Sequence, residues 1–405
     1  MNYEILSPAG NMEKLKTAIY FGADAIYFSG KQFGLRAYAN NFDNEEIVEA
    51  VNLCHNNNVK AYVTVNIVAH NRDFDNLKEY LEFLQQAGVD AVIVSDLGIM
   101  QFVKKYAPKL ELHVSTQANV TNKYTAKMYA DYGAKRIVLA RELCLSEIRE
   151  IRDYLPKDVE LEAFVHGAMC ISYSGRCLLS NFLTNRSSNK GECVQACRWQ
   201  YTINEVSRAN QKLPIEEDNY GTYILNSKDL NMLAHLGELI DAGVTSFKIE
   251  GRMKTSYYVA TVVNAYKRAL KEYLSTGKID TKLSEELEKA SNRGYTTGLY
   301  YKDVRKEESE CLSSSEPHQT HDFIAVVKGN VEGGIIVEQR NRFEVGDELE
   351  ILSPFEDFNK IIKIEKMFNQ NGESILQAKN VQELVTISTN FKLHEGDILR
   401  KKAIK

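Results

Sequence analysis

The chain has 405 residues, which is too long for one small domain and fits a large α/β domain with a smaller partner. Hydrophobic residues make up 44% and charged residues 26%, so a mainly disordered chain is excluded. The net charge is −5, so any RNA binding must use a local basic face. No apolar run is long enough to span a membrane, and Glu4 stands where a signal peptide carries positive charge. We therefore expect a cytoplasmic protein that makes no membrane contact.

Up to about residue 250, short apolar runs alternate with longer helical patterns. The runs are rich in Val, Ile, Leu or aromatic residues, which is typical of strands buried on both faces. Eight such strands are predicted, at Glu4–Ser7, Ala25–Phe28, Ala61–Val65, Ala91–Val94, Leu112–Val114, Arg136–Leu139, Leu161–Val165 and Phe247–Ile249. The predicted helices include Glu45–His55, Asp75–Gln86, Leu145–Tyr154, Leu230–Asp241 and Thr255–Tyr273. Even alternation without a Gly-x-Gly-x-x-Gly after the first strand favours a (β/α)8 TIM-like barrel over a doubly wound open sheet.

Beyond the closing helix the sequence changes character. Residues 276–320 predict a helical and turn-rich connector that includes a short helix at Leu283–Ala290. From Phe323 onward, short strand patterns are separated by tight-turn signals such as Val345-Gly346-Asp347. The domain prediction is a TIM-like barrel over residues 1–275, the connector over 276–320, and a small antiparallel β-barrel over 321–405.

Four of the seven cysteines fall within one short segment, with the spacing Cys170-x6-Cys177-x15-Cys193-x3-Cys197. A disulfide framework is not expected in a reducing compartment, so a metal or redox role is the better interpretation. The irregular spacing favours an iron–sulfur cluster over the paired knuckles of structural zinc, and unligated thiols are the third alternative. Because the segment follows the seventh strand, it is placed at the mouth of the barrel, either facing a substrate or stapling an inserted loop.

Polar side chains follow several predicted strands and would converge on the same mouth. Arginines there suit a carboxylate or phosphate ligand, and a histidine suits proton transfer, although structural support is the competing interpretation for each residue. The candidate catalytic residues are His166, Arg141, Glu142 and Glu250. The candidate substrate-binding residues are Arg252, Gln117, Asn66 and Arg36.

The sequence lacks Gly-x-Ser-x-Gly, His-Glu-x-x-His and P-loop motifs, so it predicts no familiar protease or nucleotide site. Residues 162–180, Glu-Ala-Phe-Val-His-Gly-Ala-Met-Cys followed by Ile-Ser-Tyr-Ser-Gly-Arg-Cys-Leu-Leu-Ser, resemble the signature of peptidase family U32, the collagenase-like peptidases. Further stretches are similar to other motifs of that family, at 6–11, 22–27, 33–36, 113–117, 248–254 and 293–298. The resemblance extends over nearly the whole chain.

This resemblance implies a 4Fe-4S cluster on Cys170, Cys177, Cys193 and Cys197, with zinc as the lesser alternative. Family members include hydroxylases that work without molecular oxygen on ubiquinone precursors, ribosomal RNA or the wobble uridine of tRNA. The length and the single C-terminal β-domain look most like the tRNA branch. That branch implies a tRNA hydroxylase that forms 5-hydroxyuridine and uses prephenate as co-substrate, with a paralogous family subunit as a further partner. The alternatives are a collagenase-like peptidase, a hydroxylase of another substrate such as rRNA, and an RNA-binding protein whose cluster only staples the fold.

Two basic segments are candidates for the RNA-binding face. One is the closing helix with its C-terminal extension, which carries Lys254, Lys267, Arg268, Lys271 and Lys278. The other is the C-terminal tail, with Arg400, Lys401, Lys402 and Lys405. The tail is the tighter cluster, and we expect it to reach the body of the tRNA while the barrel mouth takes the anticodon loop.

Overall fold

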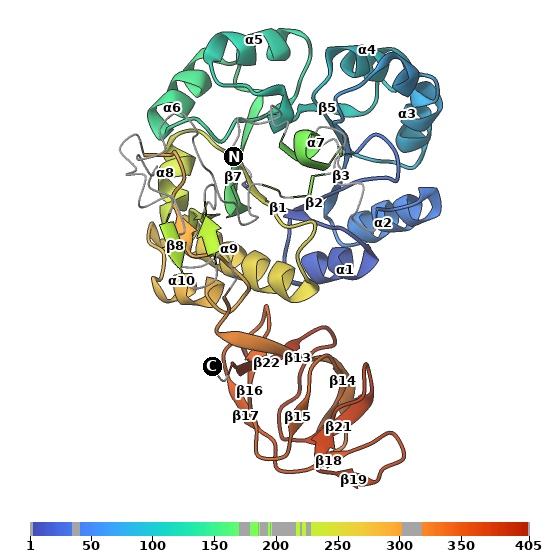
Figure 1. Ribbon diagram of the computed structural model, residues 1–405, viewed down its shortest axis with the longest axis vertical. Helices are drawn as coiled ribbons and strands as arrows, with labels where there is room; N and C mark the ends of the chain where they lie inside the picture. Colours follow the sequence, from blue (N-terminus) through green and yellow to red (C-terminus); the bar gives the residue numbers. More distant parts are fainter. Residues whose placement is uncertain are drawn as a thin grey trace.

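The computed structural model describes residues 3–34, 41–169, 179–184, 186, 193–194, 196, 216–218, 221–223, 228–301 and 318–403. Its larger part is a ring of eight parallel strands surrounded by helices (Figure 1). Neighbouring strands pair in chain order, and β7 pairs with β11 to close the ring. The strands are β1 (Glu4–Pro8), β2 (Ala25–Phe28), β3 (Lys60–Val65), β4 (Ala91–Val94), β5 (Glu111–Val114), β6 (Arg136–Val138), β7 (Glu160–Ala168) and β11 (Ser246–Ile249). The predicted TIM-like barrel is confirmed.

Several helices begin at residues whose side chains cap them, and several are followed by left-handed glycines. Asp43 and Glu46 form a capping box at the start of α2, and Gly22, Gly88 and Gly133 have φ between 80° and 104° where the chain turns back toward the next strand. No described helix is long and apolar enough to cross a membrane. The helices are α1 (Met12–Tyr20), α2 (Asn44–Asn56), α3 (Leu77–Gln86), α4 (Leu97–Tyr106), α5 (Lys123–Asp131), α6 (Leu145–Tyr154), α7 (Leu179–Thr184), α8 (Leu236–Asp241), α9 (Ser256–Thr276) and α10 (Lys282–Leu287).

The predicted helix over Leu230–Asp241 is wrong in its first half. Residues Asp229–Asn231 form a strand, β10, and the α-helix α8 begins only at Leu236, after a single helical turn at Leu233–His235. β7 is nine residues long, and its carboxyl end pairs antiparallel with β10. The extended conformation of β10 is therefore imposed by a strand that is distant in sequence. β10 in turn pairs with β12 (Tyr295–Thr296), and a separate hairpin joins β8 (Glu216–Asp218) to β9 (Gly221–Tyr223).

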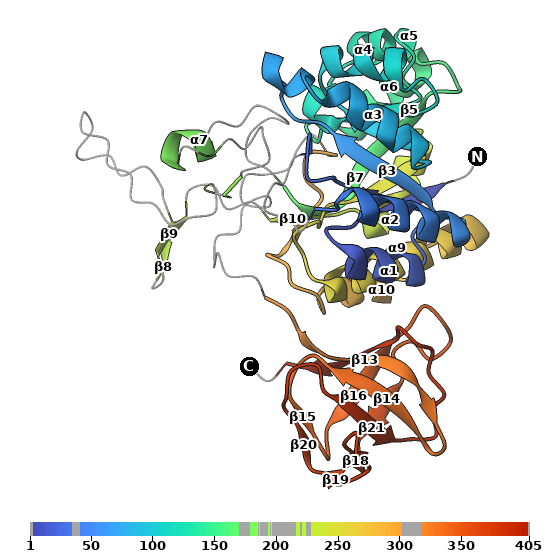
Figure 2. The ribbon, with the colours of Figure 1, turned by 90° about the vertical axis from the view of Figure 1, so that its right-hand side faces the viewer.

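The C-terminal part is an antiparallel sheet that curls into a half-barrel below the ring (Figure 2). Alternate residues of its strands point into a separate core that includes Ile335, Val337, Leu349, Ile351 and Ile387. The strands of this sheet are β13 (His321–Val331), β14 (Gly334–Gln339), β16 (Glu348–Leu352), β17 (Ile361–Lys363), β18 (Met367–Phe368), β19 (Ser374–Ile375), β21 (Leu384–Ser388) and β22 (Ile398–Lys402). In the same domain β15 (Phe343–Glu344) and β20 (Gln377–Ala378) pair with each other as a separate two-stranded sheet. The predicted boundaries at residues 275 and 320 stay predictions.

The two parts are joined by a buried ion-pair network. Arg400 of β22 is fully buried and bonds to Glu286 of α10 at 2.6 Å, to Glu350 at 2.7 Å and to Asn359 at 2.7 Å. Lys289 contacts the same two carboxylates, at 2.6 and 2.8 Å. The half-barrel is therefore fixed to the barrel.

The prediction of a basic RNA-binding tail is wrong for Arg400, whose side chain is fully buried. Arg400 forms its ion pairs within the buried network. Lys401 is half-buried and forms an ion pair with Asp347 of its own domain. Both side chains lie in a paired strand, because β22 is bonded to β13 and β16. Lys402 is exposed, and Lys405 lies outside the described residues.

The basic helix predicted as an RNA-binding face is also partly engaged within the protein. Lys267 pairs with Asp24, and Arg268 donates to the carbonyl oxygens of Ser353 and Phe355 at 3.0 and 2.9 Å. These two cations hold α9 against the barrel and the half-barrel. Their charges are therefore partly satisfied before any RNA arrives.

Candidate active site

The amino-terminal half of the barrel interior holds a network of paired charges. Arg136 donates to Glu4 at 2.6 Å and to Glu162 at 3.2 Å, and Lys248 donates to Glu162 at 2.6 Å. Burial alone would raise the pKa of Glu162, but the charges of Lys248 and Arg136 reverse this and hold the pKa below its usual value. The network closes the floor of the barrel with charges that are already paired. We therefore assign it to structural support.

Above this floor, His166 lies near the carboxyl end of β7 inside a shell of tyrosines. The rings of Tyr258, Tyr266 and Tyr295 lie 5.9, 5.5 and 5.4 Å from the imidazole, and the Tyr266 hydroxyl lies 3.4 Å from Nδ1. Burial, followed by the charge of Lys254, lowers the pKa of His166 to about 3. The imidazole is thus neutral at neutral pH. A role as a charged acid would need a change in this surrounding, whereas a hydrogen-bonding role would not.

A buried carboxylate that the sequence did not single out lies beside this histidine. Asp229 of β10 is opposite Ala168 of β7 and is 1% exposed. Within the described part of the chain neither of its carboxylate oxygens has a hydrogen-bond partner, and Lys254 Nζ lies 3.9 Å away. A buried carboxylate is costly unless it is paired or accepts hydrogen bonds. Asp229 and Lys254 therefore form a close pair of opposite charges next to β7, and Lys254 also donates to the Ser291 carbonyl oxygen at 3.0 Å.

Sequence reasoning missed Asp229 for a specific reason. Asp229 directly precedes the segment Leu230–Asp241, for which the sequence predicts a helix. An aspartate just before a helix is commonly its N-cap, so it gave no sign of another role. Only its pairing with β7 places it at the mouth. Lys254 was noticed, but as a member of a basic surface.

Arg141 and Arg252 flank β7, because they follow β6 and β11, the two strands paired with it. Arg141 donates to the carbonyl oxygen of Ala168 at 2.9 Å, and its guanidinium lies 5.0 Å from the centre of the Phe164 ring. Arg252 is 5% exposed, and its own carbonyl accepts a hydrogen bond from Lys14 at 3.1 Å. Both cations thus border the strand that leads directly into the cysteine segment.

The two candidate glutamates lie in the same loops. Glu250 follows β11, its amide donates to the His166 carbonyl at 2.9 Å, and its carbonyl accepts from the Tyr258 hydroxyl at 2.9 Å. The loop after β11 can lie this close to β7 because residue 167 is a glycine. Gly167 has φ 103°, and a Cβ there would lie 2.5 Å from the Glu250 carbonyl oxygen. Glu142 is half-buried in the turn after β6. Their side-chain roles stay predictions.

On the opposite arc of the barrel, β3, β4 and β5 end in linked polar residues. The Asn66 amide donates to the Ser115 hydroxyl at 3.3 Å, and the Asn66 carbonyl accepts from the Ser95 hydroxyl at 3.1 Å. Gln117 lies in the next turn, where its backbone amide donates to Ser115. Asn66 and Gln117 are thus brought to one arc of the mouth. Arg36 lies outside the described residues.

Of the four clustered cysteines, Cys193 is described and the other three, Cys170, Cys177 and Cys197, lie outside the described residues. The Cys193 thiol is half-buried and lies 3.9 Å from the hydroxyl of Ser180, which is in the short helix α7. Figure 2 shows α7 beyond the carboxyl ends of the barrel strands. Cys170 follows the last residue of β7 by two positions. The donor set of four thiols is chemically suited to an iron–sulfur cluster.

The scattered cysteines have different surroundings. Burial, followed by the charge of Asp90, raises the pKa of the Cys54 thiol to about 12. The Cys144 sulfur lies 3.1 Å from the Ser146 hydroxyl at the start of α6. Both are buried core residues rather than ligands.

Comparison with known protein families gives two matches that together cover most of the chain. Peptidase family U32 matches residues 10–310, and the peptidase family U32 C-terminal domain matches residues 319–400. The chain belongs to peptidase family U32.

Relatives of the chain include proteins named for tRNA hydroxylation and a collagenase. The chain is 38% identical over 404 residues to tRNA hydroxylation protein P1 of Bacillus subtilis. This alignment covers 98% of the chain and 94% of that protein. The chain is 35% identical over 412 residues to tRNA hydroxylation protein P of Escherichia coli, covering 92% of this chain and 90% of that protein. A collagenase of Porphyromonas gingivalis is 35% identical over 313 residues, which covers 74% of this chain and 73% of that protein. The similarity to the tRNA hydroxylation proteins thus extends over almost the full chain.

Proposed function

We propose that this U32 protein is a tRNA-modifying enzyme that hydroxylates the wobble uridine to 5-hydroxyuridine, without molecular oxygen and with prephenate as co-substrate. One observation carries the proposal. The likeness to proteins named for tRNA hydroxylation covers 98% and 92% of the chain and therefore includes the fixed half-barrel as well as the barrel. The half-barrel belongs to the same unit because a buried ion-pair network ties it to α10.

The cofactor of the proposed enzyme is a 4Fe-4S cluster. Cys170, Cys177, Cys193 and Cys197 would hold it, since these four thiols come after β7 in one short segment of the sequence, whereas the described Cys54 and Cys144 are buried in the core. Such a cluster would supply one-electron transfer next to the bound substrate. Zinc bound by the same thiols is the lesser alternative.

The described side chains have separate roles in this proposal. Arg141 and Arg252 bind the carboxylates of prephenate, because a planar guanidinium fork pairs with a carboxylate through two parallel hydrogen bonds. His166 stays neutral and holds the loop after β11 through its backbone carbonyl. Asp229 and Lys254 place a pair of opposite charges near His166, and the polar edge of the base is bound there. A wobble base is already unpaired, so no duplex has to be opened.

The competing function is a peptidase, as the name of the Porphyromonas gingivalis relative states for that protein. No described residues form a Ser–His–Asp or Cys–His arrangement around His166, whose neighbours are tyrosines. An rRNA hydroxylase remains the other alternative, since it would use the same mouth.

Nucleoside mass spectrometry separates these functions. Bulk tRNA and rRNA from a strain that lacks the gene are compared with those from the parent strain, and the purified protein is tested on gelatin. We expect 5-hydroxyuridine to disappear from tRNA while rRNA nucleosides are unchanged and gelatin stays intact. Unchanged tRNA together with gelatin cleavage would replace the proposal by the peptidase.

A further inference from the structure

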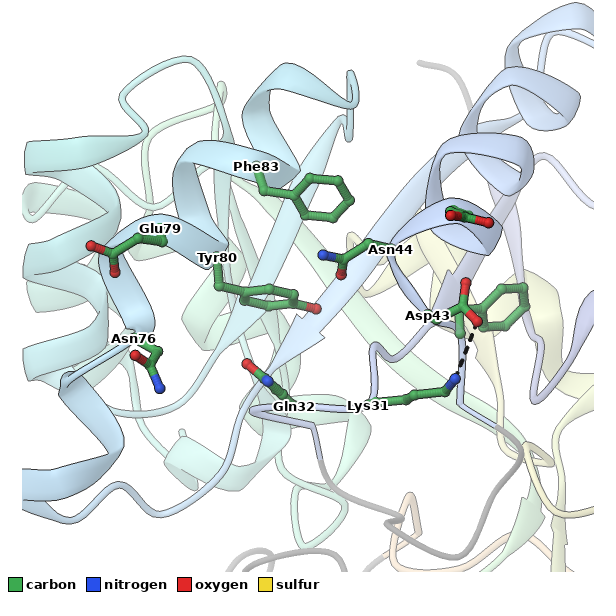
Figure 3. Close-up of a pocket in the computed structure, with 10 residues that line it drawn as sticks. Lys31, Gln32, Asp43, Asn44, Asn76, Glu79, Tyr80 and Phe83 are labelled. Atoms are coloured by element: carbon green, nitrogen blue, oxygen red, sulfur yellow. Dashed lines mark hydrogen bonds and ion pairs between the residues drawn. The ribbon is translucent and has the colours of Figure 1, made fainter.

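A pocket of about 620 Å³ lies at the rim of the barrel mouth, between α2 and α3 (Figure 3). β2 and β3 end there and α2 and α3 begin there, so it lies at the same end of the barrel as the cysteine segment. Its volume is within the range of about 300–1,000 Å³ that small-ligand sites occupy. The lining residues are Lys31, Gln32, Phe42, Asp43, Asn44, Glu45, Asn76, Glu79, Tyr80 and Phe83.

The described walls of the pocket are held in place by local bonds. Gly30 and Phe42 form an isolated bridge, and the Lys31 amide donates to the Phe42 carbonyl at 3.1 Å. Tyr80 is 7% exposed, and its hydroxyl lies so close to Gly30 that a Cβ there would be 2.2 Å away. The Tyr80 hydroxyl has no hydrogen-bond partner in the described part of the chain. The pocket therefore exists before a ligand binds.

The charges of the lining exclude an anionic ligand. Lys31, the cation among these lining residues, is already paired with Asp43 at 3.1 Å. The Asp43 carboxylate also caps α2 by accepting from the Glu46 amide at 2.9 Å, so the helix end is satisfied. Glu45 and Glu79 add negative charge to the rim. A phosphate or a dicarboxylate such as prephenate would meet repulsion here.

The remaining groups suit a neutral, planar ring with polar edges. The side-chain amides of Gln32, Asn44 and Asn76 form no hydrogen bond with described residues, and Asn76 precedes α3 without capping it. Each amide offers both donors and an acceptor. In Figure 3 the Gln32 and Asn44 side chains lie on either side of the Tyr80 ring, and the Phe83 ring lies above them. The half-buried Phe83 ring supplies an aromatic face next to these amides, and proteins bind single-stranded bases with this combination of groups.

From these features we propose that the pocket binds one unpaired base of the RNA substrate, a neighbour of the nucleotide that enters the barrel mouth. The inference rests on the proposed tRNA function and adds a second base-binding site to it. The base turns into the pocket while its phosphates stay outside, away from Glu45 and Glu79. A loop nucleotide satisfies this geometry because its base is not committed to a pair.

The test combines protein variants with an abasic scan of the RNA. Full-length Asn44→Ala and Asn76→Ala proteins, and the double variant, are titrated with a fluorescent anticodon stem-loop hairpin. The same hairpin is then made with each loop base removed in turn. Asn56→Ala and Gln86→Ala are matched controls, because these exposed residues lie at the opposite ends of the same two helices.

We expect each pocket variant to bind the intact hairpin about three- to tenfold more weakly, as the loss of one neutral hydrogen bond implies. The controls should bind like the wild type. For one abasic position, wild type and pocket variants should bind equally weakly, since the base that they read is gone. That equality identifies the base.

Two results would overturn the inference. Pocket variants that bind every hairpin like the wild type would show that no base enters, and a loss that persists undiminished with every abasic hairpin would show that the amides do not read a base. In both cases the wild type still binds and hydroxylates tRNA. A wild type that does neither would instead refute the proposed function, and this base-binding site with it.

Discussion

Replacing Arg400 by methionine should separate the half-barrel from the barrel. The guanidinium is fully buried and bonds to Glu286, Glu350 and Asn359, so methionine keeps the apolar volume but leaves two carboxylates without this partner. Removing one partner of a buried ion pair costs about 3–5 kcal/mol. Lys289 still contacts both carboxylates, so we expect the lower end, a loss of about 3 kcal/mol in the free energy of unfolding.

The loss is measured by urea denaturation followed by circular dichroism at neutral pH. Lys402→Met is the matched control, because Lys402 lies two residues further along the same strand with an exposed side chain. Adding Glu286→Gln to Arg400→Met should recover most of the loss, since the remaining charges, Lys289 and Glu350, are then paired one to one. A loss below about 1 kcal/mol for Arg400→Met, or an equal loss for Lys402→Met, would refute the assignment of Arg400 to a buried network.

Three further predictions concern the mouth. Anaerobically purified Cys193→Ala protein should lose its brown colour and its iron while Cys54→Ala keeps both, and stoichiometric zinc without iron in the wild type would contradict the cluster. Arg252→Lys should weaken prephenate binding in calorimetry, because a lysine lacks the planar fork; unchanged affinity would remove Arg252 from the carboxylate site. His166→Gln should flatten the fall in stability between about pH 6.5 and pH 3, since burial, with Lys254 next, lowers the folded pKa to about 3 while the unfolded histidine takes up a proton near 6.5. The free energy of unfolding is measured by urea denaturation at pH 7 and at pH 5. An equal fall between these two pH values in the wild type and in His166→Gln would contradict the buried neutral imidazole.

The barrel could be predicted from the sequence because its signals are local. Each strand is a short apolar run, and glycines such as Gly88 and Gly243 adopt positive φ where a helix turns back into a strand. The cysteine segment could be found for the same reason, since its residues are close in sequence. Its position after β7 then followed from the regular order of the strands.

Features that depend on distant partners could not be predicted. β10 is extended because it pairs with β7, about 60 residues earlier in the chain, and the charge of Arg400 is buried because Glu286 lies opposite it. The floor of the barrel is similar, because Arg136 and Lys248 look like ordinary strand residues until the ring brings Glu162 between them. Asp229 was missed for this reason, and so was the rim pocket between α2 and α3.

The central claim is that this chain hydroxylates the wobble uridine of tRNA with a cluster held by its four grouped cysteines. The most direct measurement incubates the anaerobically purified protein with unmodified tRNA, with and without prephenate, and quantifies 5-hydroxyuridine by mass spectrometry of the anticodon fragment. We expect the nucleoside to form at the wobble position with the wild type and prephenate, and not with Cys193→Ala. Formation by Cys193→Ala at the wild-type rate, or no formation by an iron-loaded wild type supplied with tRNA and prephenate, would contradict the account.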